Sequence, residues 1–414
     1  MKKILFVLPW LKMGGLERVQ VNIANALAER GYDVTVMTLS PENDLKAELS
    51  DKVHYVYKPY KPHPIMHRIP YIRHKFYDDG MWETRASAEK LHKYYVGNEK
   101  YDVEIGFFRG LPIKIISGGV QKCKSRRFKS NNDLSPEIGM HGEKKICTDF
   151  STESVVRLAW VHTDFRKAVG YKNNFKNTQA VKNAYAKFDK VVCVSNEAKD
   201  GFKQIVGDTN NLTTIYNLLP IKQITAQADK EPETQIRKSA FNLVLVGRLL
   251  DSAKGQVRLV KVVSRLHNEG CDLSLTLVGG GADERKIKDE IANNAAENYI
   301  FMTGSQSNPY PYIKNSDLLV CASYFEGYNL TVAEALILGT PVLSTNCTGP
   351  NEILESGKYG MIVENSEDGL YSGIKDLLDN PEKMQYYKRK ARERLDFFNE
   401  EKIVNQIEEL FDKE

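Results

Sequence analysis

Two carboxylates in one short stretch are the residues of this chain best suited to chemistry. Glu326 stands before Gly327 in a predicted tight turn, and Glu334 follows eight positions later inside an otherwise apolar run. A carboxylate on a largely buried helix needs a partner, because burying an unpaired charge costs several kcal/mol. The partner of Glu334 must come from the protein or from a ligand.

Asn329 is a good N-cap, so the sequence predicts a helix over Leu330–Leu338 that ends at Gly339. The start of such a helix offers free N–H groups and the positive end of a dipole, which suit a phosphate. A phosphate beside Glu334 suggests a nucleotide, whose ribose hydroxyls a carboxylate can accept. The alternative, a structural Glu paired with a buried Arg or a backbone donor, stays open on this stretch alone.

Two cations share one predicted strand-to-helix loop. Arg248 can grip phosphate oxygens with two donors, and Lys254 adds a mobile positive charge six positions later. Together they could neutralise a diphosphate and its developing leaving-group charge without a metal, and the sequence contains no Asp-x-Asp pair to hold one. Two solvated loop cations are the alternative.

His162 ends a predicted strand, and Gly14 and Gly15 lie between the first predicted strand and helix. A bare glycine backbone can approach a phosphate closely, although a glycine pair is also common in ordinary turns. A lone His is more often structural than catalytic, but the carboxyl end of a strand is where ligands of parallel sheets bind.

These residues need a framework of alternating strands and helices. Residues 3–8, 16–30 and 32–39 predict a strand, a helix and a strand, which form a βαβ unit. Further strands are predicted at 103–107, 158–162, 190–194, 242–246, 273–278, 299–303, 317–322, 341–344 and 360–363. Helices are predicted at 257–268, 283–295, 310–315 and 368–378, with a long charged helical stretch from 381 to 414. We therefore expect an α/β protein of two doubly wound domains, residues 1–220 and 221–394, joined by a linker at 222–238.

Charge is distributed unevenly between the two halves. Residues 1–220 hold 35 Lys and Arg against 24 Asp and Glu, a net +11, whereas residues 221–414 hold 23 against 30, a net −7. Residues 52–129 are basic and rich in aromatic side chains, which suits an anionic membrane surface. Nucleic acid is disfavoured because no recognised binding motif appears, and a solvated basic face with no special partner remains possible.

Other features bear on location. The six cysteines are dispersed without a Cys-x-x-Cys pair, which favours reduced thiols in the cytoplasm. No apolar run approaches a membrane span, and the N-terminal apolar run fits a strand better than a signal peptide. Residues 119–154 indicate a long basic loop or insertion, whose role the sequence does not reveal.

The assembled motifs resemble those of family 4 glycosyltransferases of the retaining GT-B type, over nearly the whole chain. The resemblance is carried by Gly14-Gly15-Leu-Glu-Arg, Val192-Cys-Val-Ser195, Gly247-Arg248-Leu, Lys254-Gly255, Val278-Gly-Gly-Gly281, Glu326-Gly-Tyr-Asn-Leu with Glu334, and Gly339-Thr-Pro-Val. Trp160-Val-His162-Thr-Asp-Phe165 also resembles members that build bacterial capsular or exopolysaccharide. The spacing from Arg248 to Lys254 is one residue longer than in many relatives.

The resemblance implies two Rossmann-like domains facing a central cleft, with the final helix, about 395–414, packing back on the acceptor-binding N-terminal domain. It implies donor-sugar contacts for Glu326 and ribose contacts for Glu334, while Arg248 and Lys254 hold the diphosphate. Gly14, Gly15 and the backbone around Asn329 and Leu330 would assist, and His162 would lie near the reacting centre.

The hypothesis from the sequence is therefore a cytoplasmic enzyme, peripheral on the inner face of the membrane. It would move a sugar, with retention, from a nucleotide-diphospho-sugar to a saccharide acceptor, often lipid-linked, without a metal or other cofactor. A sugar-nucleotide epimerase on a similar scaffold and a non-catalytic saccharide- or nucleotide-binding protein are the alternatives. The donor, acceptor, linkage and oligomeric state are not readable from the sequence.

Overall fold

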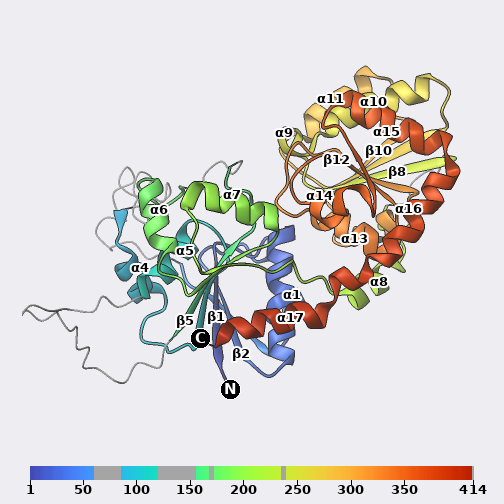
Figure 1. Cartoon of the computed structure of the whole chain (residues 1–414). Helices are drawn as coiled ribbons and strands as arrows, with labels where there is room; N and C mark the ends of the chain where they lie inside the picture. The colour runs from blue at the N-terminus through green and yellow to red at the C-terminus, as the bar shows by residue number, and fades with distance from the viewer. Residues whose placement is uncertain (60–84, 120–154, 167–171, 235–238, 413–414) are drawn as a thin grey trace, which may run out of the picture.

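Two parallel β-sheets, each flanked by helices, form the two halves of the structure (Figure 1). This computed structural model describes residues 1–59, 85–119, 155–166, 172–234 and 239–412. Residues 60–84 of the basic stretch and nearly all of the 119–154 segment lie outside the described residues. Within the described ranges, no helix is both long enough and apolar enough to cross a membrane.

The N-terminal sheet has seven parallel strands in the order β3-β2-β1-β4-β5-β6-β7. The strands are β1 (Lys3–Leu8), β2 (Asp33–Thr38), β3 (Val53–Tyr57), β4 (Val103–Gly106), β5 (Val156–Val161), β6 (Lys190–Cys193) and β7 (Leu212–Thr214). Its helices are α1 (Gly15–Glu29), α4 (Ala88–Tyr95), α5 (Leu111–Ile116), α6 (Thr178–Tyr185) and α7 (Asn196–Val206).

The C-terminal sheet has six parallel strands in the order β10-β9-β8-β11-β12-β13. The strands are β8 (Phe241–Val246), β9 (Leu273–Val278), β10 (Ile300–Gly304), β11 (Leu318–Cys321), β12 (Val342–Thr345) and β13 (Met361–Val363). Its helices are α9 (Asp251–Lys254), α10 (Gln256–Asn268), α11 (Glu284–Asn293), α12 (Tyr310–Lys314), α13 (Leu330–Leu338), α14 (Pro350–Ile353), α15 (Glu367–Asp379) and α16 (Pro381–Glu393).

The central strands are buried on both faces, as expected of parallel sheets covered by helices. All six residues of β9 are buried, and β1 is buried from Ile4 to Leu8. Most predicted elements are confirmed to within two residues, and α13 has the predicted bounds. The expected fold class, two Rossmann-like doubly wound domains, is therefore correct.

The segment expected to be a linker begins with a helix. Its first part forms helix α8 (Ile221–Ala228), which buries Ile224 and Ala228 and packs against α12 and α13. Alternating Gln and Thr side chains made this helix look like a polar connection, but two apolar positions four residues apart suffice to dock one face.

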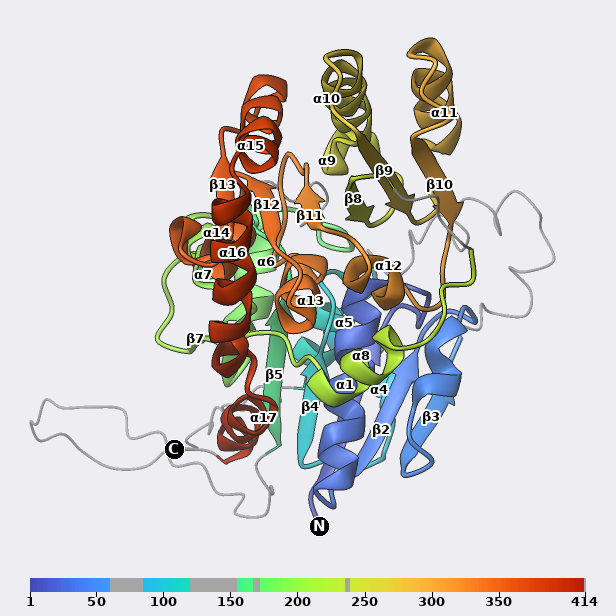
Figure 2. The ribbon, with the colours of Figure 1, turned by 90° about the vertical axis from the view of Figure 1, so that its right-hand side faces the viewer.

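The C-terminal stretch is not one helix. After α16 it passes through a 3-10 turn at Leu395–Phe398 into α17 (Glu400–Glu408). Figures 1 and 2 show this red segment running from the C-terminal sheet back to the N-terminal half. There Arg30, the C-cap of α1, pairs with Glu408 at 2.8 Å, and the rings of Tyr32 and Phe411 lie 5.4 Å apart.

Candidate active site

Gly327 brings the carboxyl ends of the two sheets into direct contact. A Cβ atom on this residue would lie only 2.1 Å from the carbonyl oxygen of His162, which follows β5. The hydroxyl of Ser195, at the N-cap of α7, donates a hydrogen bond to the Gly327 carbonyl at 3.2 Å. Only glycine allows this approach, so the turn that carries Glu326 faces the end of β5 across the domain boundary.

Glu326 is the centre of a hydrogen-bond network. Its Oε1 atom accepts from Lys254 Nζ at 2.5 Å, from Ser323 Oγ at 2.6 Å and from Asn329 Nδ2 at 3.1 Å. Among the described residues none donates to Oε2. The carboxylate is therefore fixed through one oxygen and can accept ligand hydroxyls through the other.

Lys254 reaches this site from α9, the single helical turn that follows β8. Gly255 ends the turn in the left-handed conformation, with φ +66°, and a Cβ there would lie 2.2 Å from the Ala322 carbonyl oxygen. Burial lowers the pKa of Lys254, but the carboxylate of Glu326 outweighs this and keeps the pKa above its usual value. The six-residue spacing from Arg248 thus still brings a charged ammonium to Glu326.

Arg248 lies on the same loop with an exposed side chain. Its positive charge reaches Glu17 of α1, where it helps to lower a carboxyl pKa that burial raises. Trp10 Nε1 also donates to Glu17 Oε1 at 2.8 Å. Arg248 therefore faces the glycine loop of the other domain. Glu17 belongs to the recognised motif Gly14-Gly15-Leu-Glu-Arg, but no role for its side chain was predicted from the sequence.

The glycine pair lies against the start of α13. A Cβ on Gly15 would come within 2.9 Å of Leu330 Cδ1, and one on Gly14 would lie 2.3 Å from Glu17 Oε2. Gly15 opens α1 and Leu330 opens α13, so two helix N-termini from different domains meet here. Two such ends concentrate N–H donors and positive dipole ends in one place.

Asn329 caps α13 as predicted. It adopts a left-handed conformation with φ 70°, which Asn tolerates better than most residues, and its Oδ1 accepts from the Val332 N–H at 3.2 Å. Its Nδ2 donates to Glu326 and, at 3.0 Å, to Cys321 Sγ. One side chain therefore couples the helix start to the carboxylate network.

Glu334 is only 5% exposed, one turn into α13. Tyr310 of α12 donates to its Oε1 at 3.3 Å. Burial raises the pKa of Glu334 to about 7, and the charge of Arg18 from α1 and the Tyr310 hydrogen bond offset this only in part. Glu334 thus has a protein donor and a nearby cation, but neither compensates its burial fully.

His162 is buried against aromatic rings. Its ring centroid lies 4.6 Å from that of Phe107 and 6.0 Å from that of Phe108. Neither ring nitrogen has a well-formed hydrogen bond among the described residues, and burial lowers the pKa to about 3, with a backbone contact to Phe107 opposing it weakly. The imidazole is neutral at neutral pH and suits a polar contact better than proton abstraction.

A second pair of acids, not predicted from the sequence, joins the domains beside this site. Glu352 of α14 accepts from the Asn196 backbone N–H at 2.9 Å and from Tyr216 OH at 2.5 Å. In return, Glu197 Oε2 accepts from the Gly349 N–H at 2.7 Å. The recognised motif Val192-Cys-Val-Ser195 ends directly before Asn196, but nothing in the sequence near Glu352 indicates this contact.

The described residues contain no group of three or more His, Cys, Asp and Glu side chains arranged to hold a metal ion. The predicted residues do gather at one place: Gly14, Gly15, His162, Arg248, Lys254, Glu326, Asn329 and Leu330 lie where the two domains meet, with Glu334 one turn deeper. A phosphate-sized anion between Arg248, Lys254 and the two helix N-termini would meet two side-chain cations and two positive dipole ends, with the carboxylates of Glu17 and Glu326 beside them.

Comparisons with known proteins agree across both domains. Residues 13–103 match the model described as Glycosyltransferase Family 4, and residues 227–394 match that of Glycosyl transferases group 1. An uncharacterized glycosyltransferase of Haemophilus influenzae is 24% identical over 98% of this chain and 99% of its own length. An N-acetylgalactosaminyltransferase of Campylobacter jejuni, named for a diphospho-undecaprenol substrate, is 28% identical over 46% of this chain.

Several curated relatives are matched over only part of their length. The match covers 50% of the Campylobacter protein and 43% of an uncharacterized glycosyltransferase from Methanocaldococcus jannaschii, which is 30% identical over 39% of this chain.

Solved structures match the whole fold. Anabaena HepE in complex with UDP and glucose has a TM-score of 0.68 at 16% identity and covers 99% of both chains. Staphylococcus aureus TarM in a complex that includes UDP has a TM-score of 0.70 at 14% identity and covers 100% of both chains. The two matched family models and the shared two-domain architecture establish that this chain belongs to the family 4 and group 1 glycosyltransferases of GT-B fold.

Proposed function

We propose that the protein transfers a sugar, with retention of configuration, from a nucleotide-diphospho-sugar to a saccharide acceptor. The observation that carries the proposal is the Lys254–Glu326–Asn329 network at the start of α13, which faces His162 and Gly15 of the other domain. A fixed acid with one free oxygen suits sugar hydroxyls, and the adjacent cation suits the phosphate bonded to that sugar.

Each site residue takes a role that follows from its surroundings. Arg248 and Lys254 hold the diphosphate, aided by the backbone of the two facing helix starts. Glu334 accepts from the ribose hydroxyls, because a buried, poorly compensated carboxylate gains most from new donors. When a phosphate is bound, Lys254 turns partly from Glu326 toward it.

In the proposed step, the bond from the anomeric carbon to the diphosphate oxygen breaks and the acceptor oxygen bonds to that carbon from the same face. The acceptor proton passes to the departing diphosphate, which leaves as a nucleoside diphosphate. Negative charge grows on the leaving group, so Arg248 and Lys254 act most strongly in the transition state. His162, which is neutral at neutral pH, positions a substrate hydroxyl group. The proposed step requires no metal.

We further propose a lipid-linked saccharide acceptor in capsular, exopolysaccharide or related cell-surface glycan synthesis, at the cytoplasmic face of the membrane. Support comes from the lipid-linked substrate named for the Campylobacter relative and from the net +11 of residues 1–220. Binding to vesicles of anionic lipid should weaken as salt rises. Equal binding to neutral and anionic vesicles would contradict this location.

The test is release of nucleoside diphosphate from a panel of nucleotide sugars, with and without saccharide acceptors. Turnover should collapse in Glu326→Ala and Arg248→Ala variants that melt like the wild type, while Glu382→Gln, at an exposed acid of α16, should leave it unchanged. Wild-type turnover in the first two variants would refute the assignment. Conversion of the donor without acceptor would indicate an epimerase, and binding without any turnover a non-catalytic protein.

A further inference from the structure

A cavity lies at the end of the C-terminal domain opposite the candidate active site. Its volume is about 420 Å³, within the range of small-molecule sites. It is lined where β8, β11 and β12 begin, by Phe241, Asp317 and Thr340, whereas the active-site residues follow the ends of these strands. The two sites are therefore at opposite edges of one sheet.

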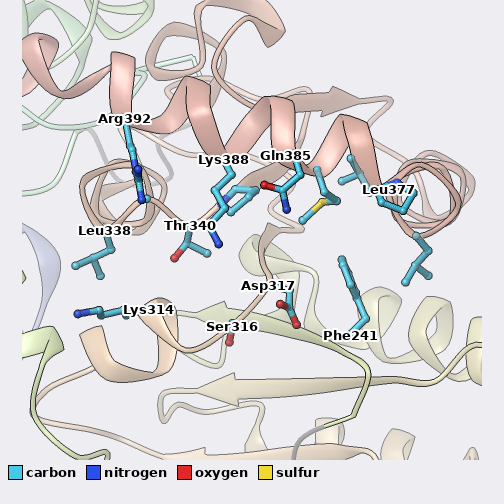
Figure 3. Close-up of a pocket in the computed structure, with 15 residues that line it drawn as sticks. Phe241, Lys314, Ser316, Asp317, Leu338, Thr340, Leu377, Gln385, Lys388 and Arg392 are labelled. Carbon is cyan, nitrogen blue, oxygen red and sulfur yellow. The ribbon is translucent and has the colours of Figure 1, made fainter.

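Helix α16 covers this cavity with a two-part lining (Figure 3). Phe241, Leu377 and Met384 provide an apolar surface, while Lys388 and Arg392 extend from α16 over the other part. These two cations lie four positions apart, so they project from one face of the helix. One end of the lining is therefore apolar, and the other end is cationic.

The charge at the cationic end is not neutralised within the protein. Among the described residues, no ion pair or side-chain hydrogen bond involves Lys388 or Arg392. Lys314, which also lines the cavity, pairs with Asp229. The single acid of the lining, Asp317, accepts from the Asn242 backbone N–H at 2.8 Å and from its Nδ2 at 2.9 Å.

The end of α13 offers a competing explanation for one of the cations. Arg392 Nε would lie 3.9 Å from a Cβ on Gly339, the C-cap of α13, where a positive charge complements the helix dipole. That role explains neither Lys388, which Figure 3 shows reaching toward Thr340, nor the cavity between α16 and the sheet.

We propose that this cavity binds a small amphipathic phosphate, with the phosphate on Lys388 and Arg392 and a single apolar chain over Phe241, Leu377 and Met384. The cavity volume fits one such molecule better than a peptide segment. Two adjacent cations without acid partners provide the charge complementarity that an anionic head requires.

The experiment is calorimetric titration of the full-length protein with octyl phosphate, below the concentration at which it forms micelles. We expect one molecule bound per chain, and at least about tenfold weaker binding of inorganic phosphate, which lacks the chain, and of octyl glucoside, which lacks the charge. Saturating nucleoside diphosphate should leave the affinity unchanged, because its proposed site lies at the other edge of the sheet.

Three variants complete the test. The double variant Lys388→Gln with Arg392→Gln should weaken the binding of octyl phosphate about tenfold or more. Met384→Trp should block this binding by filling the apolar end of the cavity. Arg389→Gln is the matched control, because this exposed cation of α16 does not line the cavity. Equal binding of octyl glucoside, an equal loss in the control variant, displacement by the nucleotide, or no binding up to about 1 mM would each overturn the proposal.

Discussion

The buried carboxyl of Glu334 should make the stability of the protein depend on pH in a direction opposite to that of most acids. Its pKa is raised from 4.5 to about 7 because burial outweighs the charge of Arg18 and the hydrogen bond from Tyr310. The folded state therefore holds this proton more tightly than the unfolded state. The stabilisation is present below the unfolded pKa and is lost as the pH rises through the folded pKa.

The magnitude follows from the two pKa values. Between about pH 5 and pH 8, ionisation of Glu334 should remove roughly 2 to 3 kcal/mol from the free energy of unfolding. Glu334→Gln keeps the shape of the side chain and removes the titration. Relative to wild type, this variant should therefore gain stability steadily across that pH range, by the same amount.

Urea unfolding of both proteins at a series of pH values measures the difference, and the comparison cancels all other titrating groups. In a second variant, Arg18→Gln, stability should decline more steeply with pH than in the wild type, because the charge of Arg18 opposes the effect of burial on Glu334. If Arg18 instead formed a dominant ion pair with Glu334, wild-type stability relative to Glu334→Gln would rise with pH. That opposite sign would refute the reasoning.

Three further outcomes follow from contacts in the site and between the domains. Gly327→Ala places a Cβ against the carbonyl of His162 and should lower kcat/KM about a hundredfold by displacing the turn that carries Glu326, with an unchanged value as the contrary result. Lys254→Gln should lower kcat about a hundredfold with little change in the KM of the donor, since its charge acts on the leaving group; a change in KM alone would contradict that role. Glu352→Gln should lower the melting temperature by about 3 °C through lost charge-assisted hydrogen bonds, whereas no shift would show that the contact is energetically neutral.

Long, strongly patterned elements could be predicted from the sequence, and short or tertiary-dependent ones could not. Helix α13 was predictable because Asn329 and Gly339 mark both ends. Strand β7 has only three partly buried residues at the edge of its sheet, so it has no distinctive pattern. Helix α8 is short and rich in Gln and Thr, so its sequence resembled a polar connection, and it packs against α12 and α13.

The candidate site shows the same division. Glu326, Lys254 and Asn329 were identifiable because polar residues at strand ends and helix starts stand out against apolar runs. The hydrogen bond from Lys254 to Glu326 joins residues 72 positions apart, and Gly327 contacts His162 of the other domain, so neither contact could be read from local sequence. Glu352 was missed for that reason, since nothing near it indicates a partner on α7.

Glu326 and Glu334 differ in the groups that surround their carboxylates, and this difference suggests how the site responds to a ligand. Glu326 is ion-paired with Lys254, so a donor phosphate must compete with it for the ammonium. Glu334 has no ion pair at hydrogen-bond distance among the described residues and is half protonated near pH 7. New donors from a ribose would therefore stabilise its anionic form. Binding should thus release a proton near neutral pH, which ties the affinity for the nucleotide to the same burial that lowers stability.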